Sequence, residues 1–84
     1  MLKVNSDPVV DSVYIQFNED PIGNIEELDG NRLIDHSLYD NKPAGIDLQA
    51  VSHGVKLDGL PEREEVERIL VGLGITVKGE QNAT

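Results

Sequence analysis

Residues 12–17 read Ser12-Val13-Tyr14-Ile15-Gln16-Phe17 and alternate core-type and other side chains with a period of two. This period places successive side chains on opposite faces of a β-strand. Val13, Ile15 and Phe17 are therefore expected to face the core, while Tyr14 points the other way. Residues 44–48, Ala44-Gly45-Ile46-Asp47-Leu48, alternate in the same way. The first fifty residues thus predict a β-sheet with one apolar face and almost no helix.

Three more strands are expected near these two, at about residues 2–5, 24–28 and 32–37. Asp29-Gly30-Asn31 is a strong hairpin signal, because Gly and Asn tolerate the positive φ angles of tight hairpins. Pro43 has no N–H for a ladder hydrogen bond, so it should begin the last strand, which extends to about Val51. Connections this short favour antiparallel neighbours. The pattern predicts an antiparallel meander of four or five strands.

Residues 61–73 change to the period of a helix. Apolar side chains recur on one stripe, at Val66, Ile69, Leu70 and Leu73. Pro61 suits the first helical turn, and Gly74 is a natural residue to end the helix. We expect this helix to pack across one face of the sheet in an α+β fold. One helix of this length covers only part of a sheet, which predicts that a partner or a second copy covers the rest.

The composition indicates one small domain over residues 1–77, followed by a disordered tail at 78–84. The chain has no cysteine, which excludes disulfides, cysteine metal sites and thiol nucleophiles. Neither a signal-peptide pattern nor an apolar run of membrane-spanning length is visible. A cytoplasmic protein without a membrane association is therefore expected.

The chain is strongly acidic. Sixteen Asp and Glu oppose seven Lys and Arg, for a net charge of −9. The basic residues are scattered along the sequence, so no basic patch for nucleic acid is expected. The charge suits a basic protein partner, although solubility alone would also explain it.

Residues 3–15 resemble the start of a prokaryotic family named only as domain of unknown function two-two-eight-three. The resemblance continues through Glu26-Glu27, Ile34-Asp35, Asp40 and Gly45-Ile46-Asp47 with Ser52. The chain departs from the family pattern at His36-Ser37-Leu38-Tyr39 and at Lys42-Pro43. This resemblance implies the α+β fold and brings no catalytic residues. Some members are suspected of pairing with small toxin-like proteins, which implies an antitoxin-like role.

Five residues are candidates for binding: Asp7, Asp11, Tyr14, Asp35 and Asp47. The carboxylates could hold a divalent cation or act in acid–base chemistry, and Asp7 and Asp11 could instead cap turns. Tyr14 could anchor a protein interface or pack against a neighbouring strand. The two histidines lack ligand-spaced neighbours, so no metal site is expected.

No serine stands beside a base in a catalytic pattern, so an enzyme is not expected. The leading hypothesis is a non-enzymatic, acidic protein-interaction domain without a cofactor. Its partner would be a small basic protein, as for an antitoxin, or a second copy in a homodimer. The alternative is a small-molecule or divalent-metal-binding module that uses the clustered carboxylates.

Overall fold

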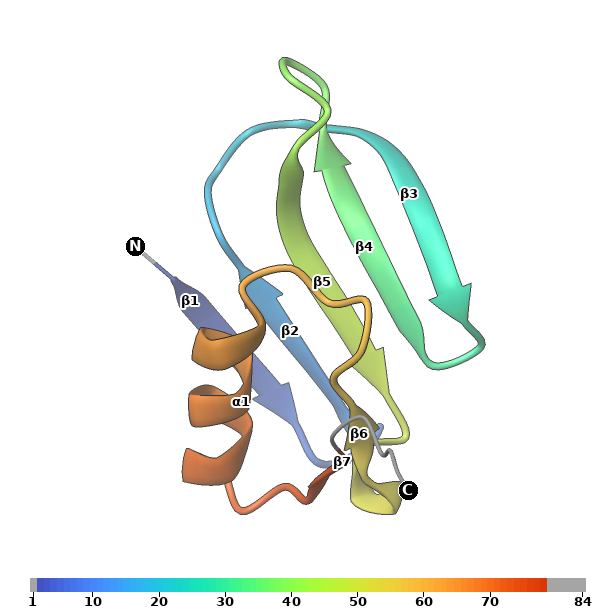
Figure 1. Cartoon of the computed structure of the whole chain (residues 1–84), viewed down its shortest axis with the longest axis vertical. Helices are drawn as coiled ribbons and strands as arrows, with labels where there is room; N and C mark the ends of the chain where they lie inside the picture. Colours follow the sequence, from blue (N-terminus) through green and yellow to red (C-terminus); the bar gives the residue numbers. More distant parts are fainter. Residues whose placement is uncertain (1, 79–84) are drawn as a thin grey trace.

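The computed structural model describes residues 2–78 and has an α+β fold, as the sequence predicts (Figure 1). Five antiparallel strands form the main sheet: β1 (Lys3–Asp7), β2 (Ser12–Gln16), β3 (Ile22–Asp29), β4 (Arg32–Ser37) and β5 (Pro43–Gln49). They are followed by a 3-10 helix, η1 (Val51–His53), and by helix α1 (Arg63–Gly72). Two short strands, β6 (Val55–Lys56) and β7 (Val77–Lys78), form a small parallel pair.

The strand order is β1-β2-β5-β4-β3, so the sheet is antiparallel throughout but not a simple meander. β2 pairs with β5, which brings Val13 opposite Leu48 and Ile15 opposite Ile46. The two strands with the clearest apolar alternation thus lie side by side, where burial is greatest. The chain between β2 and β3 crosses the end of the sheet (Figure 1), and neighbouring strands are only about 5 Å apart, so a short loop can pass β5 and β4.

The apolar face of the sheet is better covered than one helix alone would allow. Helix α1 contributes Val66 and Leu70 to the core, and both are fully buried. The segment between β5 and α1 adds four more buried residues, Val51, Val55, Leu57 and Leu60. α1 and β6 lie on the same side of the sheet (Figure 1). The expectation that this face needs a partner for its cover is therefore wrong, because the segment after β5 supplies it.

The helix ends as the sequence predicts and begins later. Gly74 has a φ of 81° and donates its N–H to the Val71 carbonyl, at 3.0 Å. The Ile75 N–H reaches the Leu70 carbonyl at 2.9 Å, which completes a Schellman motif. Pro61 lies outside the helix, because Glu62 has a left-handed backbone with a φ of 52° and precedes the first helical residue.

Several other boundaries differ from the prediction. β1 and β3 are longer than expected, and β5 ends at Gln49 because Ala50 has a left-handed φ of 53°. Gly30 and Asn31 form the β3–β4 turn without a positive φ. Instead, the Asp29 carboxylate accepts the Asn31 N–H at 2.9 Å. Lys78 belongs to β7 rather than to a tail, and positions 79–84 of the predicted tail lie outside the described residues.

A hydrogen-bonded histidine links β3, β4 and the β4–β5 turn at one end of the sheet. His36 Nδ1 lies 2.9 Å from the Asn41 carbonyl oxygen, and Nε2 lies 2.9 Å from a Glu26 carboxylate oxygen. Both ring nitrogens therefore face acceptors, and only the imidazolium form donates to both. The hydrogen bond to Glu26, supported by the one to Asn41, raises the pKa of His36 above its ordinary value of 6.5.

This arrangement predicts a pH-dependent stability. The unfolded chain has the lower His36 pKa, so the stabilisation is complete below that value and is lost as pH rises through the raised folded pKa. We expect the melting temperature of the wild type to fall between about pH 6 and 8 relative to a His36→Gln variant. Thermal unfolding of both proteins across this range measures the difference. A constant difference between them would contradict the prediction.

Candidate functional site

The candidate site lies on the face of the sheet that is turned away from α1, which we call the outer face. Its central part consists of the side chains that alternate with the buried ones on β2, β4 and β5. Tyr14 on β2 lies opposite Asp47 on β5, and Asp35 on β4 lies opposite Gly45 on β5. The pairing of β5 with β2 on one side and with β4 on the other thus assembles three of the five predicted candidates, Tyr14, Asp35 and Asp47.

Tyr14 reaches across β5 to contact β4. Its hydroxyl donates a hydrogen bond of 2.7 Å to Asp35 Oδ2. The ring lies directly over Gly45, where an added Cβ would stand 2.3 Å from Tyr14 Oη and 2.8 Å from Cζ. A side chain at position 45 would displace the ring. Glycine at this position therefore allows the tyrosine to be held flat against the sheet and hydrogen-bonded at its tip.

The electrostatics of the outer face keep Tyr14 a hydrogen-bond donor. Burial of the phenol raises its pKa, and the hydrogen bond to Asp35 together with the charges of Asp35 and Asp47 raises it further. Deprotonation would place a third negative charge beside two carboxylates. Tyr14 is therefore a poor candidate for a phenolate base or nucleophile, and its chemistry suits contact and hydrogen bonding.

Asp47 completes the polar network of the outer face. Its Oδ1 accepts a hydrogen bond of 2.7 Å from Gln49 Nε2, on the same strand. Each carboxylate has about four acceptor sites, so Asp35 and Asp47 both retain capacity for further donors. Ile25 on the edge strand β3 lies opposite Asp35 and is 60% exposed. The outer face thus combines two half-buried carboxylates, a fixed tyrosine and an exposed apolar side chain.

The other two candidates, Asp7 and Asp11, lie at the β1–β2 turn and make different contacts. Asp7 Oδ1 accepts the Val9 N–H at 3.1 Å, as expected for an Asp that precedes Pro. Asp11 was expected to cap its own turn but instead binds Ser52, 41 positions away, through the backbone N–H at 3.0 Å and Oγ at 2.7 Å. Asp11 thereby joins the hairpin to η1.

These two carboxylates line a hollow of about 310 Å³ beside the end of α1, separate from the outer face. The candidates therefore fall into two groups. Across residues 2–78, no three His, Asp or Glu side chains come together in a way that could hold a metal ion.

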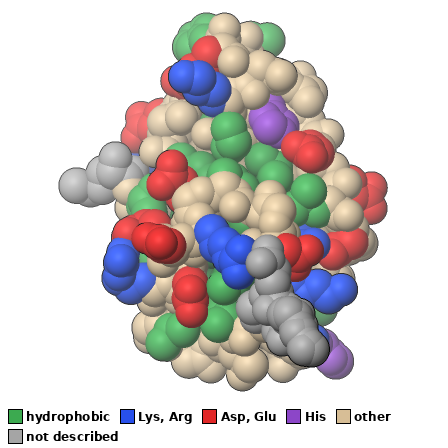
Figure 2. Space-filling model, in the orientation of Figure 1, with side chains coloured by type: hydrophobic (Ala, Val, Ile, Leu, Met, Phe, Trp, Pro, Cys, Tyr) green, Lys and Arg blue, Asp and Glu red, His purple; other side chains and the backbone are tan. Residues whose placement is uncertain are grey.

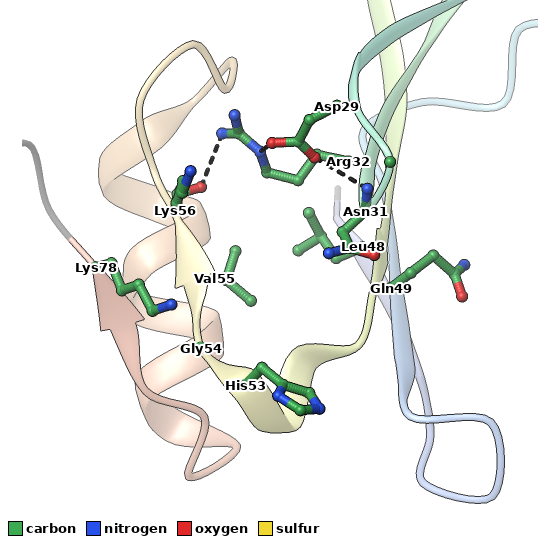
Figure 3. A pocket seen from close by; sticks show the side chains of 11 residues that line it. Asp29, Asn31, Arg32, Leu48, Gln49, His53, Gly54, Val55, Lys56 and Lys78 are labelled. Carbon is green, nitrogen blue, oxygen red and sulfur yellow. Dashed lines mark hydrogen bonds and ion pairs between the residues drawn. The ribbon is translucent and has the colours of Figure 1, made fainter.

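A second group of residues was missed by the sequence analysis. Arg32 is 8% exposed and lies on the core side of β4 beside a pocket of about 290 Å³ (Figure 3). Its Nε donates to Asp29 Oδ2 at 3.0 Å, and its Nη1 donates to the carbonyl oxygens of Lys56 at 3.0 Å and Asp58 at 2.6 Å. One feature of the sequence could have indicated this role. Arg32 has the same strand phase as the buried Ile34, and it follows Asp29 by three positions.

The same pocket corrects the view that the basic residues are scattered. Lys56 and Lys78 are register partners on β6 and β7, and both line the pocket with Arg32 and His53 (Figure 3). Three of the seven Lys and Arg residues thus gather at one place. Asp29 shares the pocket, where the Asn31 N–H, with help from Arg32, lowers the pKa of its carboxyl. Elsewhere on the face that Figure 2 shows, acidic side chains (red) and basic side chains (blue) alternate without a large patch of either.

Comparison of the chain with protein-family models, with curated proteins and with solved structures gave no match. The resemblance to domain of unknown function two-two-eight-three stays a prediction. Among residues 2–78, no helix has the length and apolar character needed to cross a membrane.

Proposed function

We propose that this chain is a non-enzymatic protein-interaction domain that binds a basic protein on its outer face. The observation that carries the proposal is Tyr14, which is fixed between Asp35 and Asp47 in the middle of that face. Helix α1 and the β6–β7 pair lie on the opposite side of the sheet, and η1 lies beyond the end of β5 (Figure 1). The outer face is thus accessible across all five strands of the described chain.

The held conformation of Tyr14 suits an anchor residue. Tyrosine combines a large apolar ring with a polar tip and is enriched among the residues that dominate binding energy. Here the Asp35 hydrogen bond and the close approach to Gly45 already restrict the side chain. Binding therefore costs less side-chain entropy than it would for a freely rotating tyrosine.

Charge defines the expected partner. Asp35 and Asp47 can accept hydrogen bonds from Lys or Arg side chains, and charge-assisted bonds of this kind are the strongest available to a polar surface. The net charge of −9 adds a long-range attraction that speeds association with a basic protein. In its specific form, the proposal is that the domain acts as an antitoxin-like partner of a small basic protein.

The test compares three bait proteins that are exposed to a lysate of the organism from which the sequence comes. The wild-type chain, an Asp47→Lys variant and a Glu67→Lys variant are immobilised, and retained proteins are identified by mass spectrometry. Glu67 is exposed on α1, so its variant makes the same charge change on the other side of the sheet. The partner is then purified, and its affinity for each bait is measured by calorimetry.

We expect one basic protein whose affinity falls at least about tenfold with Asp47→Lys and stays within about twofold with Glu67→Lys. Its affinity for the wild type should also fall as salt is raised, because the contact is between opposite charges. The proposal fails if the wild-type bait retains no specific protein. It also fails if both variants bind the captured protein as the wild type does.

A further inference from the structure

We propose that two copies of this chain pair through strand β1, antiparallel and about a two-fold axis at Asn5, so that their sheets join into one. This contact uses an edge of the sheet, so it goes beyond the outer-face function and does not depend on it.

β1 is an open edge. It stands first in the strand order and pairs only with β2 among the described strands. All five of its residues are exposed, and its register with β2 is regular, without a bulge. It contains no proline. An edge strand of this kind offers its outward N–H and C=O groups for pairing with another chain.

The opposite edge, β3, has the features that prevent such pairing. Its register with β4 is interrupted both near Ile22 and near Asp29. Glu26 and Glu27 lie in the middle of the strand, where a second copy would bring like charges together. Bulges and charge are among the usual means of blocking an edge. Of the two edges, β1 is therefore the one that accepts a second copy.

The charges of β1 are complementary to themselves. Lys3 and Asp7 lie at the two ends of the strand, equally distant from Asn5. In a two-fold antiparallel pairing centred on Asn5, Lys3 of each copy lies opposite Asp7 of the other, so the favourable pair occurs twice. Within one chain, Lys3 bonds Glu19 at 2.9 Å, but both side chains are more than 60% exposed. Such surface pairs are weak and exchange readily.

Apolar side chains flank the same edge. Val4 on β1 is 42% exposed. Leu73 is 44% exposed and lines the same hollow as Ser6, Asp7 and Pro8, which places the end of α1 beside the end of β1. A second copy on β1 would cover part of this apolar surface, which adds a hydrophobic contribution to the backbone pairing.

The test uses variants in which the charge of Lys3 or of Asp7 is reversed. Sedimentation equilibrium at about 10–500 µM chain is run on the wild type, on Lys3→Glu, on Asp7→Lys and on an equimolar mixture of the two variants. Each variant alone places like charges opposite each other, so its dimer should weaken at least about tenfold. In the mixture, both cross-strand pairs are again opposite in charge, so a heterodimer of near wild-type affinity should form.

Two controls keep the result interpretable. Circular dichroism checks that Asp7→Lys, which also loses the turn cap at Val9, remains folded. Glu27→Lys changes a charge on β3 and should leave the dimer unchanged. A monomeric wild type, a Lys3→Glu dimer of wild-type affinity, or a mixture that fails to restore pairing would overturn the proposal. None of these outcomes alters the Asp47→Lys test of the outer face.

Discussion

An Arg32→Met variant should lose about 2–4 kcal/mol of unfolding free energy in urea titrations. Methionine fills a similar volume, so the loss comes from the polar groups that Arg32 satisfies. The carbonyl oxygens of Lys56 and Asp58 would lose their donor, and Asp29 would lose its ion-pair partner. Unpaired polar groups near the core cost far more than an exposed pair gains.

The control for this variant is Arg68→Met, which removes an exposed arginine from α1. Arg68 pairs with Glu65 on the helix surface, and its loss should change the unfolding free energy by less than about 0.5 kcal/mol. Hydrogen exchange adds a local measurement. Amides of residues 55–58 should lose protection first in Arg32→Met, because Arg32 holds this segment against the β3–β4 hairpin. Equal stability of the two variants would contradict the assigned role.

A Leu70→Ala variant should be destabilised by about 2–5 kcal/mol. Leu70 is fully buried between α1 and the sheet and belongs to the main apolar cluster. Alanine is the best helix former, so the loss would reflect packing rather than helix propensity. Domains of this size have about 5–15 kcal/mol of stability in all, so the effect should be visible as a large fall in melting temperature.

Val71→Ala is the matched control for Leu70→Ala. Val71 is the next residue on the same helix, but its side chain is 57% exposed. Its truncation should change the unfolding free energy by less than about 0.5 kcal/mol. Similar losses for the two variants would mean that α1 does not pack on the sheet through the stripe that includes Leu70.

The individual residues of the candidate site could be predicted from the sequence, but their arrangement in space could not. Tyr14 was identified because it alternates with apolar neighbours on its strand, and Asp35 and Asp47 were identified because their carboxylates could bind a cation or act in acid–base chemistry. Their assembly depends on the pairing of β2 with β5 and of β5 with β4, which joins segments far apart in the chain. Asp7 and Asp11 carry the same chemical signal, yet they lie at a turn, where Asp7 caps the turn and Asp11 binds Ser52.

The local periods were readable from the amino-acid order: a period of two in the strands, which gave the core face of β2 and β5, and a period of 3.6 in α1, which stops shortly before Gly74. These patterns are visible because they depend on neighbours within a few positions. The strand order, the cover of the apolar face by residues 51–60 and the Arg32 contacts became visible in the three-dimensional structure alone. Each of these depends on contacts between segments that are far apart in the chain, and a local periodicity contains no information about such contacts.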